Sequence, residues 1–323
     1  KSQDILVDVG AFQLTLTSPA NELTILPSAQ NITIEATSSL PANFTLKANE
    51  VVINTSASTL TSYSFVYNVA VNTNFTLEAT NNGDIQTRSF RVVITPTVTE
   101  EPVPSGMLDG INLDPSDATK ATLVLFAPGK QFVHLIGDFN NWQINDTYLL
   151  KKDSAKNRFW IELTGLTPQF NHMFQYLVDF SINIADPYST TILDPFNDQF
   201  IDTVTYPNLH AYPSAFTTEA VTLLRTGDPA YTWQTTGYQR PARTDRVVYE
   251  VLIRDFDALH SFNAVKNRLD YLQGLGVNVL EFMPVSEFDG NESWGYNPSF
   301  HMALDKYYGT VTAFKELIDE CHA

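Results

Sequence analysis

The sequence contains very little cysteine and far fewer basic than acidic residues. Its only cysteine, Cys321, excludes an internal disulfide framework and a metal site built from cysteines. Lysine and arginine total 19 against 36 aspartates and glutamates, which gives a formal net charge of −17. A nucleic acid partner is therefore disfavoured, because binding to phosphates depends on clustered basic side chains. Cys321 lies at helical spacing from Phe314, Leu317 and Ile318, which predicts a buried thiol on an apolar helix face.

Long hydrophobic runs are also missing. No apolar stretch approaches the roughly 18 residues that a membrane-spanning helix needs. No secretory signal is present at Lys1, but the chain starts as a mature or trimmed sequence would, so this says little about export. Apolar residues nevertheless make up 43% of the 323 residues, which is enough for several packed cores and predicts two or three domains.

Residues 1–97 are expected to be all-β. Apolar and polar residues alternate along six stretches, which gives each strand one buried and one solvent-facing side. The apolar members are Phe12, Leu14 and Leu16; Ile32, Ile34 and Ala36; Phe44, Leu46 and Ala48; Tyr63, Phe65 and Tyr67; Phe75, Leu77 and Ala79; and Phe90, Val92 and Ile94. Asn82-Gly83 lies between two of these stretches and suits a tight hairpin turn. About seven strands in this length predict an immunoglobulin-like β-sandwich.

A linker and a second β-rich block follow. Prolines, acids and a glycine break the periodicity of residues 98–106, which are therefore expected to be a linker. The block at 107–212 contains His-Leu-Ile-Gly-Asp-Phe-Asn-Asn-Trp at 134–142, Asn-Arg-Phe-Trp at 157–160 and Ala-Asp-Pro-Tyr at 185–188. These motifs resemble carbohydrate-binding module family 48, and the resemblance implies a second, small β-sandwich of the immunoglobulin-like kind.

The same block offers candidate glucan-binding residues. Asn140, Asn141 and Trp142 place amides and an aromatic ring on a predicted exposed turn, and Trp160 is a further aromatic candidate. In glucan-binding members of the resembled module, a second tryptophan and a lysine complete the site. Residues 175–182 of this chain have glutamine and isoleucine or serine instead. Glucan binding and a purely structural role therefore both stay open, and the departure favours the structural role.

The pattern changes after a connector at 213–245. Residues 246–253 form a nearly continuous apolar strand, and Ser261 is placed to cap the helix that follows. A second apolar strand at 277–283 and a helix from about Thr312 complete the order strand, helix, strand, helix. This order predicts parallel strands and the first βαβα quarter of a TIM (β/α)8 barrel over 246–323.

The loop after the second strand carries the strongest chemical signal. A sugar presents an apolar C–H face and a rim of hydroxyls, so its recognition needs an aromatic plane beside fixed polar groups. Trp294 and Tyr296 supply planes, and Asn291, Asn297 and His301 supply polar groups. Pro298 stiffens the loop, because it favours an extended conformation at Asn297. The alternative is that the two rings pack the loop against the barrel.

Residues 281–309, from Glu-Phe-Met-Pro through Trp-Gly-Tyr-Asn-Pro to Asp-Lys-Tyr-Tyr-Gly, closely resemble the second barrel strand and following loop of glycoside hydrolase family 13, the α-amylase family. The resemblance implies that Tyr296 stacks under the sugar at the cleavage point. It also implies retaining hydrolysis by paired carboxylates, which the family keeps on later barrel strands. We therefore expect no catalytic residue in this chain. Calcium is only weakly implied for the parent enzyme, and no metal ligand set is expected here.

The acidic residues near the predicted strand ends have structural interpretations. The pairs Asp255/Asp257 and Glu287/Asp289 are interpreted as solvated loop charges or acids at helix N-termini. Glu281 lies within an apolar strand, so we expect it to be buried and paired, with Arg254 as the candidate partner.

The sequence thus predicts the N-terminal part of an α-glucan-active enzyme, acting on starch, glycogen or maltodextrin. The alternatives are a non-catalytic glucan-binding or scaffold protein, or a branching or debranching enzyme of the same family. The bare strand edges of 246–323 should be covered by further barrel residues or a second copy of the chain. The domain composition suggests a secreted, periplasmic or cell-surface location in a bacterium.

Overall fold

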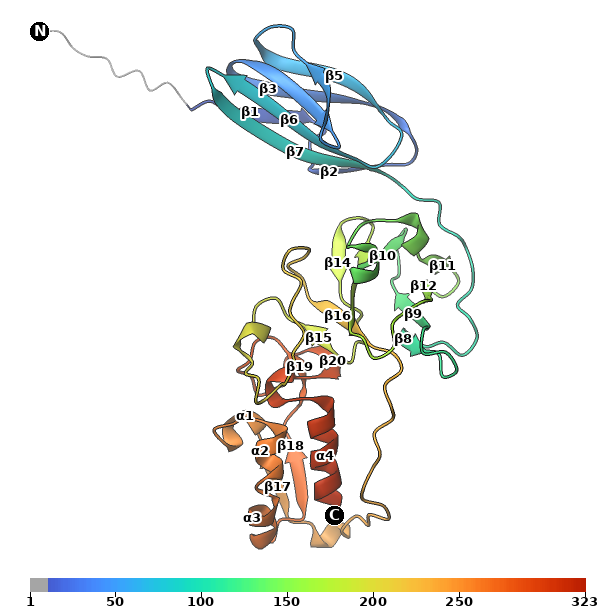
Figure 1. Cartoon of the computed structure of the whole chain (residues 1–323), viewed down its shortest axis with the longest axis vertical. Coiled ribbons are helices and arrows are strands. Elements are labelled where there is room, and N and C mark those ends of the chain that lie inside the picture. Colours follow the sequence, from blue (N-terminus) through green and yellow to red (C-terminus); the bar gives the residue numbers. More distant parts are fainter. Residues whose placement is uncertain (1–10) are drawn as a thin grey trace, which may run out of the picture. The chain divides into compact units, whose positions relative to one another are not determined.

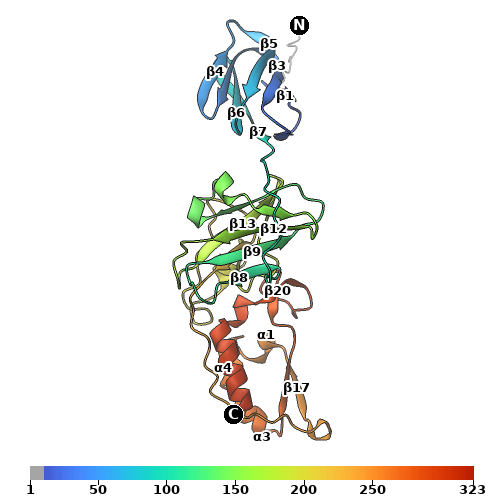
Figure 2. The ribbon, with the colours of Figure 1, turned by 90° about the vertical axis from the view of Figure 1, so that its right-hand side faces the viewer.

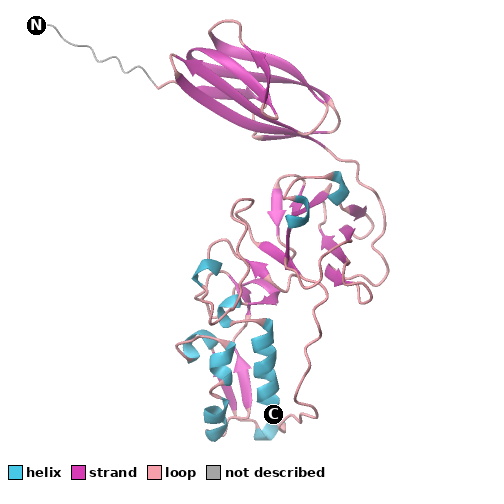
Figure 3. Ribbon diagram, in the orientation of Figure 1, coloured by secondary structure: helices cyan, strands magenta, loops and turns pink. Residues whose placement is uncertain are grey.

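The computed structural model describes residues 11–323, so the first ten residues of the predicted β domain lie outside it. The chain divides into two compact units at Thr97/Val98. It is mainly β, as predicted, and the α-helices gather near the C-terminal end of the chain (Figure 3). Within the described part of the chain, no helix has the length and apolarity to cross a membrane.

The first unit is built on one long strand. Its strands are β1 (Leu14–Ser18), β2 (Leu23–Leu26), β3 (Gln30–Ala48), β4 (Val51–Thr55), β5 (Leu60–Val69), β6 (Thr73–Asn81) and β7 (Asp84–Ile94). The first half of β3 pairs with β1 and β5, and its second half pairs with β4 and β6. Strand β7 pairs with β6 and, in parallel, with β2 (Figure 1).

The predicted alternation accounts for the core of this unit. Ile34 and Ala36 from the first half of β3 share one buried cluster with Phe44 and Leu46 from its second half. The ring of Tyr67 on β5 meets that of Phe75 on β6 edge-on at 5.3 Å, so residues of both strand sets meet in one core. Asn82 and Gly83, with φ of 48° and 94°, form the predicted hairpin turn between β6 and β7.

The second unit begins with two sheets. One has the order β10-β13-β16-β15, with β14 also paired to β13. The other has the order β11-β12-β9-β8, of which Figure 2 shows β12, β9 and β8 in succession. The strands are β8 (Gly110–Leu113), β9 (Ala121–Phe126), β10 (Val133–Gly137), β11 (Lys151–Asp153), β12 (Arg158–Leu163), β13 (His172–Val178), β14 (Ile182–Ile184), β15 (Ile192–Leu193) and β16 (Val221–Leu224). Residues of both sheets, among them Leu125, Phe159 and Tyr176, form their common core.

Two segments differ from the predicted boundaries. The backbone N–H of Val103 donates to Asp153 at 3.0 Å and its side chain packs against Trp160, so the segment expected as a linker is bound to the second unit. Strand β16 comes from the segment expected as a connector. All its residues are buried, so it has no polar–apolar alternation by which to recognise it.

The C-terminal part contains the predicted parallel pair, β17 (Val248–Val251) and β18 (Val279–Phe282). The helices are α1 (Ile253–Phe256), α2 (Phe262–Lys266), α3 (Leu269–Gly274) and α4 (Val311–His322). Ser261 caps α2 as expected, accepting from the N–H of Ala264 at 3.1 Å. A break at Asn267 and Arg268 divides the predicted first helix into α2 and α3.

The α-helices lie beside this strand pair (Figure 1). A buried cluster contains Val251 of β17, Phe262 of α2 and Leu317 of α4. The start of β17 is less covered, since Val248 and the preceding Val247 are 51% and 49% exposed. The loop expected after β18 also forms a hairpin of β19 (Ser286–Phe288) and β20 (Pro298–Leu304), which the sequence did not predict.

Candidate functional site

The candidate site lies on the segment between β19 and β20. We call residues 289–297 the aromatic loop. Its rings are open to solvent, with Trp294 62% and Tyr296 65% exposed. Because Val251 pairs with Phe282 at the ends of β17 and β18, the segments leaving both strands start at the same edge of the sheet. Two large exposed rings on such an edge suit contact with an apolar ligand face, and their exposure argues against the alternative that they pack the loop.

Gly295 separates the two rings and touches the end of the preceding strand segment. Its φ is +86°, in the left-handed region that favours glycine, and a Cβ atom there would lie 2.2 Å from the carbonyl oxygen of Pro284. Its N–H donates to Oγ of Ser293 at 3.0 Å. The backbone at Gly295 therefore packs directly against Pro284, in the segment that follows β18.

The polar candidates occupy different surroundings. Asn297 is exposed, and its side-chain oxygen accepts a hydrogen bond from the Ser293 hydroxyl within the loop. His301 is exposed on β20, and its backbone oxygen accepts from the Ser286 hydroxyl at 3.2 Å. Asn291 donates from Nδ2 to the backbone oxygen of Asn197 at 3.0 Å. Asn297, next to Tyr296 in the chain, and His301 on β20 are thus open to solvent. Asn291 instead ties the aromatic loop to Asn197.

The acids that follow β17 are paired in ways that favour the charged form. Arg254 donates to both carboxylate oxygens of Asp255, at 2.7 and 2.9 Å, and this hydrogen bonding lowers the pKa of Asp255. Hydrogen bonds from the Leu259 N–H and from Arg268 lower the pKa of Asp257. A general acid needs a raised pKa. The lowered pKa values therefore argue against a general-acid role for either residue, and Asp255 lies in the first turn of α1, one of the two placements expected from the sequence.

The interpretation of Glu281 was wrong. Its side chain is exposed, and Arg254 pairs with Asp255 instead. With part of the β17–β18 pair uncovered, an acid within β18 can reach solvent and needs no buried partner.

Glu287 is the opposite case, because the sequence interpretation placed it among solvated charges and the structure buries it. Glu287 is 6% exposed, and its carboxylate contacts the amino group of Lys306, which is 2% exposed. Lys306 also lies 3.2 Å from the carboxylate of Asp198, on the 3₁₀ helix η3 (Asp198–Phe200). Asp305 is buried beside them and accepts hydrogen bonds from the N–H groups of Tyr307 and Phe288. Only Glu287 Oε2 of this group has no hydrogen-bond partner among the described residues.

Burial sets the titration of this group. It raises the pKa of Glu287 to about 7 and that of Asp305 to about 6, although Lys306 opposes both shifts. Burial acts against the charge of Lys306, but the carboxylates of Glu287 and Asp198 raise its pKa above the usual value. The ammonium and at least one carboxylate are thus held charged together at neutral pH.

The second candidate surface consists of Asn140, Asn141 and Trp142, and two of these side chains make contacts that stabilise the local structure. Asn140 accepts from the Gly137 N–H and donates to the Leu135 oxygen, both at 2.9 Å, so its amide closes the turn. Trp142 stacks on Phe216 with ring centroids 5.7 Å apart and planes 8° apart. Asn141 is exposed and adopts a left-handed conformation. Of this set, Asn141 and the outer face of the Trp142–Phe216 stack remain accessible.

Trp160 is buried. It is 5% exposed, its Nε1 donates to the backbone oxygen of Glu101 at 3.0 Å, and Lys151 lies over its ring at 4.3 Å. Its ring anchors the segment after Thr97, which removes Trp160 from the candidate glucan-binding surface.

Side chains of the types that bind metals are not clustered in the described part of the chain. Across residues 11–323, no three or more histidines, cysteines, aspartates or glutamates are grouped so as to hold a metal ion. Where carboxylates do gather, around Glu287 and Asp198, the cation between them is Lys306.

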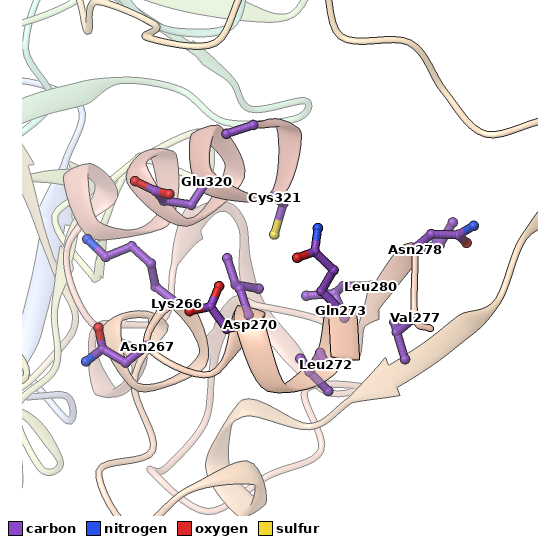
Figure 4. Close-up of a pocket in the computed structure, with 13 residues that line it drawn as sticks. Lys266, Asn267, Asp270, Leu272, Gln273, Val277, Asn278, Leu280, Glu320 and Cys321 are labelled. Atoms are coloured by element: carbon purple, nitrogen blue, oxygen red, sulfur yellow. The ribbon is translucent and has the colours of Figure 1, made fainter. Parts of the chain in front are cut away.

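A groove of about 760 Å³ lies at the other end of the strand pair, between α3, the start of β18 and the end of α4. Figure 4 shows the thiol of Cys321 pointing into it, near Gln273. Cys321 is exposed, so the prediction of a buried thiol was wrong. The helix face that carries it has the expected apolar spacing, but at this last turn Cys321 lines the open groove.

Comparison with known proteins gives related enzymes. Malto-oligosyltrehalose trehalohydrolase of Rhizobium sp. (strain M-11) is 37% identical over 102 residues, which are 31% of this chain and 17% of that protein. The 1,4-alpha-glucan branching enzyme of Pseudoalteromonas atlantica is 26% identical over 214 residues, which are 61% of this chain and 26% of that protein. The resemblance to the α-amylase family is confirmed.

A crystal structure from Salmonella typhimurium, assigned as an alpha amylase, agrees with this result. It has a TM-score of 0.50 and 25% sequence identity, and the match covers 67% of this chain and 32% of that one. None of the protein-family models matches the chain. The chain thus matches only part of each curated relative, about a sixth of the length of the trehalohydrolase and about a quarter of the length of the branching enzyme.

Proposed function

We propose that this chain is the N-terminal portion of a retaining glycoside hydrolase of family 13 that acts on α-glucosidic bonds in starch, glycogen or maltodextrin. One observation carries the proposal: Trp294 and Tyr296 are exposed together on a loop at the carboxyl-end edge of a parallel strand pair. Such an edge is where barrel enzymes bind their substrates. The relatives' names, a trehalohydrolase of malto-oligosyltrehalose and an α-glucan branching enzyme, support the same substrate class.

The proposal includes a fold. Residues 11–97 would be an immunoglobulin-like sandwich, 107–212 with β16 a family 48-like sandwich, and 246–323 the first quarter of a (β/α)8 barrel. The two sheets with a common core support the second assignment. The parallel pairing of β17 and β18 across a helical crossover supports the third. Further barrel residues would supply the catalytic carboxylates and cover the exposed edge at Val247 and Val248.

In this arrangement Tyr296 is the proposed platform under a glucose ring, with Trp294 as a second plane. Asn297 and His301 are the proposed hydrogen-bonding groups for sugar hydroxyls, since both are exposed, one next to Tyr296 in the chain and the other on the strand that follows the aromatic loop. A secreted, periplasmic or cell-surface location is part of the proposal, because two β domains precede the barrel segment of an α-glucan-active enzyme. Transfer of the glucan chain, as in branching, is the alternative reaction within the family.

Isothermal titration of the 323-residue chain with maltoheptaose tests the platform. Tyr296→Ala should weaken binding about tenfold, because loss of a stacked ring costs on the order of 1.4 kcal/mol. Tyr271→Ala is the matched control, since Tyr271 is a similarly exposed tyrosine, at 62%, on α3. Equal affinities of both variants and the unchanged chain would contradict the proposed role of Tyr296.

A non-catalytic glucan-binding or scaffold protein would also pass the binding test. The complete reading frame separates the two proposals. An aspartate and a glutamate on later barrel strands would favour the enzyme, because retaining hydrolysis needs two carboxyl groups about 5 Å apart. Their absence would favour the binding protein.

A further inference from the structure

The buried group around Lys306 joins two segments that are distant in sequence. We call Asp198, Glu287 and Lys306 the ion cluster. Asp198 belongs to η3, Glu287 to β19, and Lys306 follows β20 in the 3₁₀ helix η5 (Lys306–Tyr308). One oxygen of Asp198 lies 3.2 Å from the Lys306 amino group, and the other accepts the N–H of Asp194 at 2.9 Å. The cluster therefore ties both ends of the β19–β20 hairpin to residues 194–198.

Two further contacts join the same segments. Asn291, in the aromatic loop, donates to the backbone oxygen of Asn197 at 3.0 Å. On β20, the buried Ala303 packs with Ala185 and Ile192, and the partly buried Phe300 lies against them. The hairpin is thus held at its base by charge and apolar packing, and within the loop by a side-chain amide.

Stability alone is a weak reason for such a cluster. Removing charges from water costs several kcal/mol per ion, so apolar residues of similar volume often serve a fold equally well. A buried ion pair does fix one geometry, however, because its members have few other partners. Each member of the ion cluster is 8% exposed or less, so water offers little competition. A hairpin fixed by apolar contacts alone can slide, whereas an ammonium between two carboxylates defines a single position.

We propose that Asp198, Glu287 and Lys306 are positioning residues, which orient the aromatic loop so that Trp294 and Tyr296 meet a glucan chain in one defined pose. The segment at 185–198 therefore takes part in substrate binding without touching the sugar. This inference rests on the proposed function for its ligand.

Asp198→Asn is the test variant, because it removes the charge and keeps the volume. Lys266→Met is the control, since Lys266 forms a 2.6 Å pair with Glu316 away from the loop. In Asp198→Asn, maltoheptaose affinity should fall about tenfold by titration calorimetry, which corresponds to about 1.4 kcal/mol. The control should bind as the unchanged chain does.

A double-mutant cycle separates positioning from general damage. If Asp198 acts through the platform, Asp198→Asn should change affinity less than about twofold when Tyr296→Ala is already present. A loss of the same size in both backgrounds would overturn the proposal, and so would an unchanged affinity of Asp198→Asn alone.

Hydrogen exchange gives a readout that needs no sugar. Amides of 286–304 should exchange about tenfold faster in Asp198→Asn, while those of β9 and β12 keep their protection. If the unchanged chain fails to bind maltoheptaose, the proposed function fails, but this exchange measurement still decides whether the cluster holds the hairpin. Unchanged exchange in 286–304 would overturn the positioning role.

Discussion

Gly295 lies so close to Pro284 that a Cβ atom at Gly295 would be 2.2 Å from the Pro284 carbonyl oxygen. This contact joins the backbone of the aromatic loop to the residues that leave β18. The rings of Trp294 and Tyr296 are exposed, but the backbone between them packs against Pro284. This close approach is possible because Gly295 has no side chain.

Gly295→Ala should therefore lower the unfolding free energy by more than backbone strain at a positive φ accounts for, because the new methyl group would also clash with Pro284. Gly290→Ala is the matched control, since Gly290 lies in the same loop with φ of +84° but has no atom within 4 Å of its virtual Cβ. The control should lose about 1–2 kcal/mol of unfolding free energy from backbone strain. Gly295→Ala should lose clearly more in urea denaturation and should also weaken maltoheptaose binding. Equal losses would show that the Pro284 contact yields easily.

The purified 323-residue chain should release no reducing sugar from soluble starch. The acids after β17 are held charged by Arg254, Arg268 and backbone N–H groups, and Glu287 is buried with Lys306. Without a paired acid and nucleophile, glycosidic cleavage loses many orders of magnitude in rate. Release of reducing sugar that persists after repeated purification, and that is lost when Asp255, Asp257 or Glu287 is replaced by its amide, would refute this prediction.

The stability of the second unit should depend on pH through Glu287. Burial raises its pKa from 4.5 to about 7, so the folded chain keeps a proton that the unfolded chain releases. The contribution of this group to stability therefore falls as pH rises from about 4.5 to about 7. Asp305, whose pKa burial raises to about 6, and Asp198, whose pKa burial also raises, act in the same direction.

Glu287→Gln removes this titration. Relative to the unchanged chain, its unfolding free energy should rise between pH 4 and pH 8 by at most about 3 kcal/mol. Glu316→Gln is the control, because Glu316 also pairs with a lysine but is 45% exposed. Parallel pH profiles for the unchanged chain and Glu287→Gln would contradict the raised pKa.

Trp142→Ala should act on stability and leave glucan affinity unchanged. The Trp142 ring stacks on Phe216 and packs with Leu193, Val221 and Leu223. Its loss should lower the unfolding free energy by about 3 kcal/mol, as aromatic truncations in cores do, or less because the ring is partly exposed. Thermal unfolding and titration with maltoheptaose measure the two effects. Weaker binding at full stability would return Trp142 to the glucan-binding candidates.

Local patterns predicted the elements whose signal lies within one segment. Alternation predicted β1, β5, β6 and β7 of the first unit and both halves of β3, although it gave these halves as two strands and missed β2 and β4. Asn82-Gly83 predicted the hairpin turn, and Ser261 the start of α2. The parallel pair also followed from the strand–helix–strand order. The strands, the turn and the helix start depend on residues within a few positions of one another, whereas the parallel pair depends on the order of elements over residues 246–283.

Properties set by distant residues could not be predicted. The burial of Glu287 depends on Lys306 and on Asp198, which is 89 positions before it in the chain (287 − 198). Strand β16 is recognisable only by its partners β13 and β15, since all four of its residues are buried. The exposure of Cys321 depends on what covers its helix face, which no periodicity within the helix records.

Strand β3 has a consequence for how the first unit comes apart. One continuous backbone, Gln30–Ala48, supplies pairing partners to β1 and β5 at its start and to β4 and β6 at its end. If β1 and β5 unfold, or if β4 and β6 unfold, β3 loses part of its hydrogen bonding, and the other pair of strands depends on β3 as well. The unit should therefore melt in one cooperative step, and a single backbone cut between Ser38 and Ala42 should weaken both halves at once.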